Sequence, residues 1–221
     1  MWIAAIATAL AFLVALVQST TNTPVFLNDF FSNNTHHLLP ALRDLKFLGK
    51  ENLHVLEIGS YEGRSTRWFM EYVMTHDTAL MVCIDTWKGS DEMRDNPQQV
   101  DRLYKRFIHN IFPYMDQIQL VRGNAMSMLF TDTVRSKEYD IIYIDADHYA
   151  QSALAQGVIT WPLLKKGGLM IWDDYRWWYE RCGPKFDDLY CPKQGVDMFL
   201  KLYSNELKVV FDNYQMGVQK I

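Results

Sequence analysis

The chain has 221 residues, close to the size at which one hydrophobic core still serves a whole molecule, so we expect a single domain. Hydrophobic residues make up 49% of the chain and charged residues 22%, a globular balance that argues against an intrinsically disordered protein. The net charge is -4, and Lys and Arg form no basic stripe along the sequence. The charge therefore argues against nucleic acid as a partner.

The first 17 residues are apolar apart from Thr8 and contain no charged side chain. Such a stretch is typical of a signal peptide or a membrane anchor. We therefore expect residues 1–19 to direct the chain into the secretory pathway or to anchor it in a membrane, and residues 20–221 to form the domain. No Lys or Arg precedes the apolar run, so a buried N-terminal helix of a cytoplasmic protein is the alternative. Any membrane contact is expected through this segment only.

Two further features agree with a secretory route. Asn33, Asn34 and Thr35 form a sequon for N-glycosylation. Cys182 and Cys191 lie close together in a loop-like stretch, and a disulfide between them would need an oxidising compartment. Two free thiols are the alternative. Cys83 lies inside an apolar stretch, where we expect a small core residue.

Apolar stretches alternate with amphipathic ones through the middle of the chain. We expect strands at residues 53–58, 79–84, 118–121, 139–144 and 168–172. We expect helices at residues 36–47, 65–74, 100–111 and 149–164. Strands that alternate with helices indicate a parallel sheet with helices on both faces.

The C-terminal part has a different pattern. Residues 195–203 are expected to be helical, and residues 207–211 and 214–218 to be strands joined by a two-residue turn at Asp212 and Asn213. Such a turn favours an antiparallel hairpin. A hairpin at the end of a doubly wound sheet is unusual in dinucleotide-dependent dehydrogenases.

A glycine-containing loop follows the first expected strand. Gly59 and Gly63 let the backbone turn sharply and approach a ligand closely at the carboxyl end of the strand. Their spacing is G-x-x-x-G, which differs from the G-x-G-x-x-G of a nicotinamide site. Asp85 ends the second strand, where an acidic residue can accept both hydroxyl groups of an adenosine ribose, although a solvated strand-end carboxylate is the alternative. Asn124 and Ala125 follow the third strand and are expected beside the adenine.

Acidic residues also follow the fourth and fifth strands. Asp145 and Asp147 come after residue 144, and Asp173 and Asp174 come after residue 172. Because adjacent parallel strands end at the same edge of a sheet, these carboxylates can converge, and carboxylate oxygens suit Mg²⁺. The alternative is that they cap the helices that follow, as Asp147 or His148 could do before the helix at residue 149.

Residues 26–220 resemble the class I S-adenosylmethionine-dependent methyltransferases, and specifically the metal-dependent branch that methylates hydroxyl groups of small molecules. The first motif of that family resembles residues 56–66, with the sequence LEIGSYEGRST. Its later motifs resemble residues 143–148, 164–168 and 172–175 in order and spacing. The resemblance implies a doubly wound, mostly parallel sheet of seven strands that ends in an antiparallel hairpin.

The resemblance also implies the cofactor and the roles of individual residues. S-adenosylmethionine is expected to contact Glu57, Gly59, Ser60, Tyr61, Gly63, Ser65, Asp85, Asn124, Ala125 and Asp145. In the metal-dependent sugar O-methyltransferases of antibiotic pathways, the first Asp of an Asp-x-Asp motif and a later Asp pair hold Mg²⁺, and the second Asp of the motif is the proposed base. By resemblance, Asp145, Asp173 and Asp174 bind the metal and Asp147 is the base. His148 departs from that pattern and is the alternative base.

The expected reaction is transfer of a methyl group to a small hydroxylated acceptor. The transfer is an in-line displacement, so the protein must align donor and acceptor. Residues 172–179 and the segment with Phe26, Phe30 and Phe31 are expected to wall the acceptor, although core packing is the alternative for each aromatic. A non-catalytic S-adenosylmethionine-binding protein and an NAD-linked oxidoreductase are the alternative functions. Assembly into a homo-oligomer stays open.

Overall fold

The computed structural model describes residues 22–89, 97–177 and 190–221. The expected leader at residues 1–19, together with Cys182, Trp178 and Tyr179, lies outside the described residues. Within the described ranges, no helix has both the length and the apolar character that a membrane span requires.

The centre of the fold is one sheet of seven strands in the order β3-β2-β1-β4-β5-β7-β6. The strands are β1 (His54–Ile58), β2 (Leu80–Asp85), β3 (Ile118–Arg122), β4 (Tyr139–Ile144), β5 (Leu164–Trp172), β6 (Leu207–Asp212) and β7 (Met216–Lys220). The first five strands are parallel, and β7 runs antiparallel to both β5 and β6. This topology confirms the predicted fold class. The strand order reverses between β1 and β4, where open α/β sheets bind their ligands.

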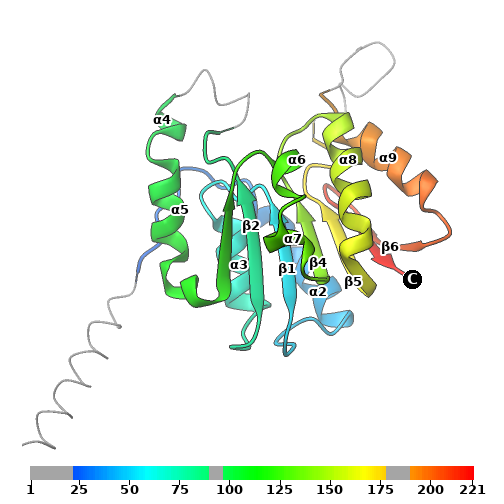
Figure 1. Ribbon diagram of the computed structural model, residues 1–221, viewed down its shortest axis with the longest axis horizontal. Helices are drawn as coiled ribbons and strands as arrows, with labels where there is room; N and C mark the ends of the chain where they lie inside the picture. Colours follow the sequence, from blue (N-terminus) through cyan, green and yellow to red (C-terminus); the bar gives the residue numbers. More distant parts are fainter. Residues whose placement is uncertain (1–21, 90–96, 178–189) are drawn as a thin grey trace, which may run out of the picture.

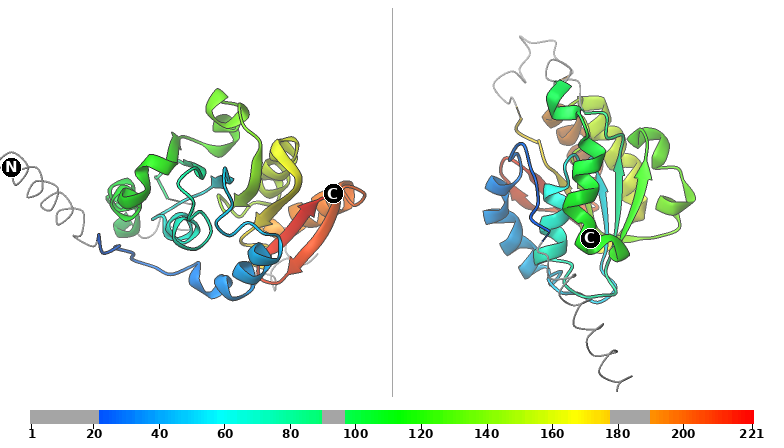
Figure 2. Two further views of the ribbon diagram at one scale, coloured as in Figure 1. Left: turned by 90° about the horizontal axis from the view of Figure 1, so that it is seen from below. Right: turned by 90° about the vertical axis from the view of Figure 1, so that its left-hand side faces the viewer.

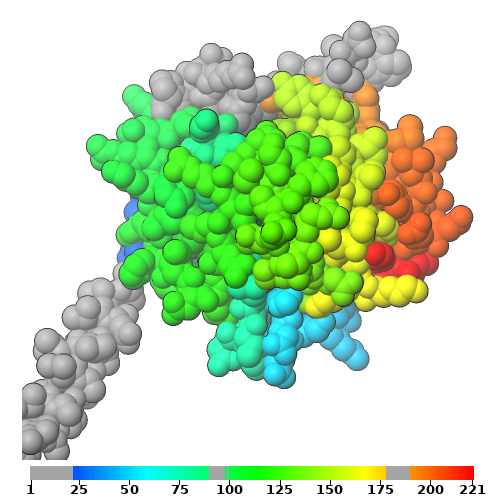
Figure 3. Space-filling model, in the orientation of Figure 1, coloured from blue at the N-terminus to red at the C-terminus, as the bar shows by residue number. Residues whose placement is uncertain are grey.

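Helices cover both faces of the sheet and make three layers (Figure 1; Figure 2). One face carries α2 (Thr35–Asp44), α3 (Arg64–Tyr72) and α5 (Leu103–Ile111), and the other carries α6 (Ala125–Met128), α7 (Asp132–Arg135), α8 (Ala150–Thr160) and α9 (Pro192–Leu202). The short helices are η1 (Ser32–Asn34), α4 (Pro97–Val100), η3 (Phe112–Gln117) and η4 (Trp161–Leu163). Figure 3 shows the green and yellow side chains of α6, α7 and α8 packed over the second face.

The alternation of side chains along β4 explains the two buried clusters. Ile141 and Tyr143 pack against α2, α3 and α5, whereas Ile142 and Ile144 pack toward α7, α8 and α9. Successive residues of a strand point to opposite faces, so a strand that is covered on both faces is apolar throughout. Cys83 of β2 is buried in the first cluster, as predicted for a small core residue.

Several predicted boundaries differ from the structure, and two of them change an element that we described above. The turn of the C-terminal hairpin contains three residues, because Asp212 pairs with Met216 and a bulge between Val209 and Phe211 shifts the register. Tyr214, which we expected in a strand, therefore lies in this turn. The predicted helix at residues 149–164 ends at Thr160, since Pro162 follows in η4, and β5 already begins at Leu164.

Candidate active site

A cavity of about 550 Å³ opens at the carboxyl ends of β1, β2 and β4. One part of its wall contains the predicted cofactor residues Gly59, Ser60, Tyr61, Ser65, Asp85, Asn124 and Ala125. Another part contains Asp145, Asp147, His148, Asp173 and Asp174. The structure therefore brings together, in one cavity, residues from five loops that are far apart in the sequence.

Residues 59–63, which we call the donor loop, pass close to the end of β4. Gly59 has φ 90°, and a Cβ atom there would lie 1.8 Å from the backbone oxygen of Asp145. Gly63 has φ 79°, and a Cβ atom there would lie 3.0 Å from the ring of Phe107. Gly59 is required by both backbone conformation and space, whereas Gly63 is favoured by its backbone conformation and by a tight contact with Phe107. Gly63 does not line the cavity but begins α3 behind it.

Glu57 lies beneath the donor loop and does not line the cavity. Its carboxylate is fully buried and accepts hydrogen bonds from the hydroxyl groups of Ser60 (2.5 Å), Ser65 (2.7 Å) and Thr66 (2.5 Å). Burial raises the pKa of this carboxyl, although the three hydroxyl groups oppose the shift. The geometry gives Glu57 a role in holding the loop and the start of α3 in place.

Asp85 holds the donor loop from the side of β2. Its Oδ2 accepts the backbone N–H groups of Ser60 (2.8 Å) and Tyr61 (2.9 Å), and its Oδ1 accepts that of Trp87 (2.5 Å). An ionised carboxylate offers about four acceptor positions, so these three bonds leave capacity for a ligand hydroxyl group. Asp85 therefore both shapes the loop and faces the cavity.

Asn124 begins α6 in the way that an N-cap residue does. Its side-chain oxygen accepts the backbone N–H of Met126 at 3.0 Å, which leaves its amide nitrogen available to a ligand. Ala125 follows it on the cavity wall.

At the other part of the wall, one carboxylate oxygen from each of Asp145 and Asp174 and one ring nitrogen of His148 lie within 4.8 Å of one another. We call these three residues the Asp–His cluster. His148 Nε2 donates to Asp174 Oδ2 at 2.9 Å. Two carboxylates and an imidazole can act together as ligands of a divalent cation. The imidazole suits transition metals better than Mg²⁺.

Asp173, a predicted metal ligand, is not part of the Asp–His cluster. Its side chain is 4% exposed, and its Oδ1 accepts the amide groups of Asn34 (3.1 Å) and Gln215. The backbone N–H of Asp173 still bonds to Ile144, so Asp173 continues the alternation of β5 and faces the layer that contains Asn34. Asp174 follows in a turn, which directs its carboxylate toward Asp145 and His148.

The acids in this part of the cavity repel one another. Burial raises the pKa of the Asp145 carboxyl well above its usual range, and the carboxylates of Asp173 and Asp174 raise it further. Burial and the neighbouring Asp174 raise the pKa of Asp173 to about 7. A bound cation would relieve this repulsion, so the electrostatics fit a metal site.

Asp147 lies just before α8. Its Oδ1 accepts the backbone N–H of Tyr149 at 3.2 Å, but Tyr149 is itself the N-cap residue, so this bond belongs to the preceding turn and is not the helix cap considered as the alternative from the sequence. It also lines the cavity, as a base would have to. His148 lies against the ring of Trp177, with 4.2 Å between ring centroids.

Sequence reasoning missed two residues in the β6–β7 turn. The Tyr214 hydroxyl donates to Asp174 Oδ1 at 2.6 Å, and Gln215 is fully buried beside Asp173. Tyr214 lines the cavity. No pattern in the sequence pointed to them, because the turn that carries them was predicted to be one residue shorter.

The predicted aromatic walls are present only in part. Phe30, Phe31 and Trp177 line the cavity. Trp172 is instead a core residue that packs on Phe199, and the hydroxyl of Tyr175 bonds to Asp197. Phe26 lies over the guanidinium group of Arg64, 4.1 Å from ring centroid to Cζ. Core packing, the alternative reading, therefore applies to Trp172 and Tyr175.

Residues 56–175 match a protein-family model that is described as a methyltransferase domain. This match covers more than half of the chain. The chain belongs to this methyltransferase family. The glycine spacing and the family together give no support to an NAD-linked oxidoreductase.

Individual proteins that are similar to this chain are also methyltransferases. The O-methyltransferase hkm8 of Aspergillus hancockii is 30% identical over 128 residues, which are 57% of this chain and only 45% of that protein. The O-methyltransferase from Bacillus cereus, solved in complex with SAH, has a TM-score of 0.62 and 19% identity, covering 94% of this chain and 89% of that one. The MycE methyltransferase of the mycinamycin biosynthetic pathway, solved with Mg, SAH and mycinamycin VI, has a TM-score of 0.58 and 17% identity, covering 87% of this chain and 50% of that one. At these identities the two structures establish the shared fold.

Proposed function

We propose that the protein transfers the methyl group of S-adenosylmethionine to a hydroxyl group of a small acceptor, with the help of a divalent cation. The observation that carries this proposal is that Asp145 contributes to both parts of the cavity, one with its backbone and the other with its side chain. Its backbone oxygen lies where Gly59 can have no Cβ atom, and its carboxylate belongs to the Asp–His cluster. The donor loop and the candidate metal ligands are therefore adjacent within one cavity.

The donor end of the cavity fits S-adenosylmethionine. Gly59 leaves room for a close approach to the backbone, and Asp85 supplies a carboxylate with capacity left for a ribose hydroxyl group. Asn124 offers an amide nitrogen to the edge of the adenine ring. The structure of the Bacillus cereus O-methyltransferase with SAH is similar in fold, which supports the same cofactor here.

The acceptor would meet the Asp–His cluster. A divalent cation held there by Asp145 and Asp174 would lower the pKa of the acceptor hydroxyl group. His148, oriented by its bond to Asp174, can remain a ligand or take the proton, and Asp147 can take the proton when His148 is a ligand. Mg²⁺ is the expected ion, supported by the Mg in the similar MycE structure, and the imidazole makes Mn²⁺ a competitor that the test includes.

Turnover with and without a chelator tests this proposal. Labelled S-adenosylmethionine is incubated with a panel of phenolic and sugar acceptors, and Mg²⁺ or Mn²⁺ is then added back. We expect turnover that the chelator abolishes and the cation restores, while donor binding persists. Donor binding without turnover on any acceptor would favour a non-catalytic binding protein, and full turnover in excess chelator would exclude the metal.

Two variants test whether Asp174, and not the adjacent Asp173, is a ligand of the metal. Asp174→Asn removes a carboxylate of the Asp–His cluster and should weaken metal binding by at least about 10-fold. Asp173→Asn should weaken it less, because Asp173 is bonded to Asn34 and Gln215 instead. Calorimetric titration with Mn²⁺ distinguishes the two, and a larger loss in Asp173→Asn would restore the ligand set that the sequence predicted.

We also propose that the chain enters the secretory pathway or is anchored to a membrane. The disulfide-bonded state of Cys191 supports this, since disulfides persist in oxidising compartments. Asn33 of the sequon is exposed, so a glycan there would meet no buried surface. Expression of the full chain in a eukaryotic cell, followed by intact mass before and after reduction and glycosidase treatment, tests the route. An unprocessed, reduced chain without glycan would support the cytoplasmic alternative.

A further inference from the structure

Residues 22–31, which we call the N-terminal strap, run along the outside of the donor loop. In Figure 2 the blue segment passes from α5 toward α2. Helix α2 packs on β6, a strand of the C-terminal hairpin. Three residues of the strap, Asn28, Phe30 and Phe31, line the same cavity as the donor loop. The strap has no regular secondary structure, so its position depends on hydrogen bonds to its neighbours and on the packing of Phe31 in the core.

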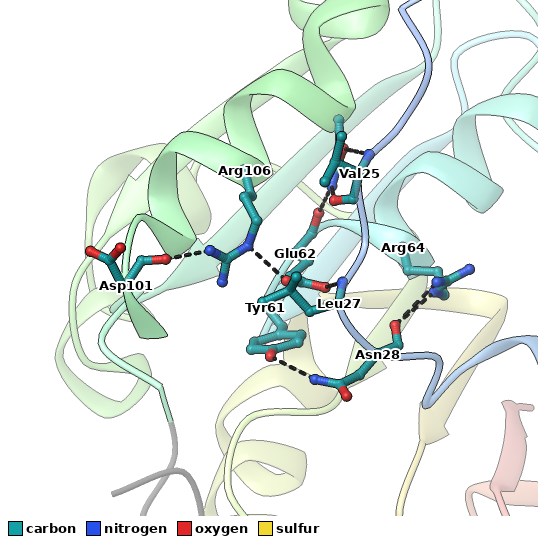
Figure 4. A network of polar contacts seen from close by, with 9 residues as sticks. Val25, Leu27, Asn28, Tyr61, Glu62, Arg64, Asp101 and Arg106 are labelled. Atoms are coloured by element: carbon teal, nitrogen blue, oxygen red, sulfur yellow. Dashed lines mark hydrogen bonds and ion pairs between the residues drawn. The ribbon is translucent and has the colours of Figure 1, made fainter. Parts of the chain in front are cut away.

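Two buried side chains supply the bonds at Val25 and Leu27 in the middle of the strap (Figure 4). Glu62 is 1% exposed, and its Oε2 accepts the backbone N–H of Leu27 at 2.8 Å while its Oε1 accepts Arg106 Nε at 2.8 Å. Asn110 is fully buried and bonds to both backbone groups of Val25, as acceptor at 2.7 Å and as donor at 2.8 Å. The side chains thus replace the strand partner that the strap lacks.

The same two residues also hold the donor loop. Glu62 is itself a residue of the loop, and its backbone oxygen accepts the amide of Asn110 at 2.8 Å. Beside them, the Asn28 amide lies 3.4 Å from the Tyr61 hydroxyl, and Arg64 donates to the Asn28 backbone oxygen at 3.1 Å. A change in the position of the strap therefore changes the constraints on the loop.

We propose that Glu62 and Asn110 are positioning residues for the donor, because they fasten the strap and the donor loop into one wall of the cavity. Docking of the strap is then part of donor binding, and by linkage a bound donor stabilises the docked strap. This inference rests on the proposed function, since it assumes that the donor loop binds S-adenosylmethionine. It adds that residues 22–31 belong to the donor site.

Glu62→Gln is the first test, because it keeps the shape of the side chain and removes one charged acceptor. We expect amide hydrogen exchange at Leu27 to become about 10-fold faster and the affinity for S-adenosylhomocysteine to fall by about 10-fold, the worth of one bond to a charged group. Asn110→Asp, which removes the donor to Val25 and to Glu62, should have the same two effects.

Asp212→Asn is the matched control. Asp212 also pairs with an arginine, since Arg176 Nη2 lies 2.7 Å from its Oδ1, but this pair is exposed at the end of β6, away from the donor loop. This variant should change neither the exchange at Leu27 nor the affinity for S-adenosylhomocysteine.

A measurement on the unaltered chain keeps the proposal testable if a variant does not fold. Saturating S-adenosylhomocysteine should slow amide exchange at Val25 and Leu27 by several-fold. Binding without such slowing, or a Glu62→Gln protein with a freed Leu27 amide and full affinity, would overturn the proposal. A chain that binds no S-adenosylhomocysteine would instead contradict the proposed function.

Discussion

At the scale of single residues, Gly59 is the position in the donor loop with the least space for a side chain. Gly59→Ala would place a Cβ atom 1.8 Å from the Asp145 backbone oxygen in addition to the cost of φ 90°. We expect β1 and β4 to separate at their ends, with a loss of several kcal/mol of stability and of donor binding. Urea unfolding and calorimetry with S-adenosylhomocysteine measure the two effects.

Gly167→Ala is the control for backbone strain alone. Gly167 has φ 78°, and nothing lies within 4 Å of a Cβ atom built there. This variant should cost only about 1 kcal/mol and should keep donor binding intact. Equal losses in the two variants would show that strain, and not the contact with Asp145, limits position 59.

The candidate site illustrates which residues a sequence can indicate. Strand-end acids and glycines are visible as motifs, and the positions of Asp85, Asp145 and Asp174 at one cavity followed from parallel strands that end at the same edge. The divergence of Asp173 from Asp174 was not visible, because it depends on where β5 gives way to a turn. Tyr214 and Gln215 were not visible either, because their contacts depend on the length of a distant turn.

At the scale of elements, the start of β4 depends on a buried acid outside the site. The Asp140 carboxylate is 2% exposed and accepts Lys50 Nζ (2.5 Å), Lys165 Nζ (2.8 Å) and the backbone N–H of His54 (2.9 Å). Burial alone would raise the pKa of Asp140, but the bond from His54 and the two lysines outweigh it and leave that pKa below its usual value. These bonds connect β1, β4 and β5 at the edge opposite the cavity.

Asp140→Asn should lower the free energy of unfolding by about 2 kcal/mol at pH 7, the magnitude of a bond to a charged group. Because the folded-state pKa lies below the unfolded value of about 3.9, the stabilisation by Asp140 is complete above that value and is lost as the pH falls through the folded-state pKa. Urea unfolding from about pH 7 to about pH 3 should therefore show a shallower acid decline in Asp140→Asn.

Asp212→Asn provides the comparison, since the Asp212 pair with Arg176 is exposed. An exposed pair contributes at most about 1 kcal/mol, so this variant should stay close to the unaltered chain. A loss at Asp140 no larger than that at Asp212 would contradict the role given to the buried acid.

At the scale of the whole molecule, the sequence predicted the layers better than the boundaries. Alternating apolar strands and amphipathic helices led to the seven-stranded sheet and its terminal hairpin. The N-terminal strap had no such signal, because its polar bonds to Glu62 and Asn110 connect positions at least 35 residues apart. Long-range polar contacts of this kind leave no periodicity in the sequence.

The central claim is that the cavity binds S-adenosylmethionine through the donor loop and Asp85. Calorimetric titration of the full chain with S-adenosylmethionine tests it most directly, alongside Asp85→Asn, which keeps the shape of the side chain but removes a charged acceptor. We predict one donor bound per chain and an affinity at least about 10-fold weaker in Asp85→Asn. No binding to the folded, unaltered chain, or equal affinity in the two proteins, would contradict the account.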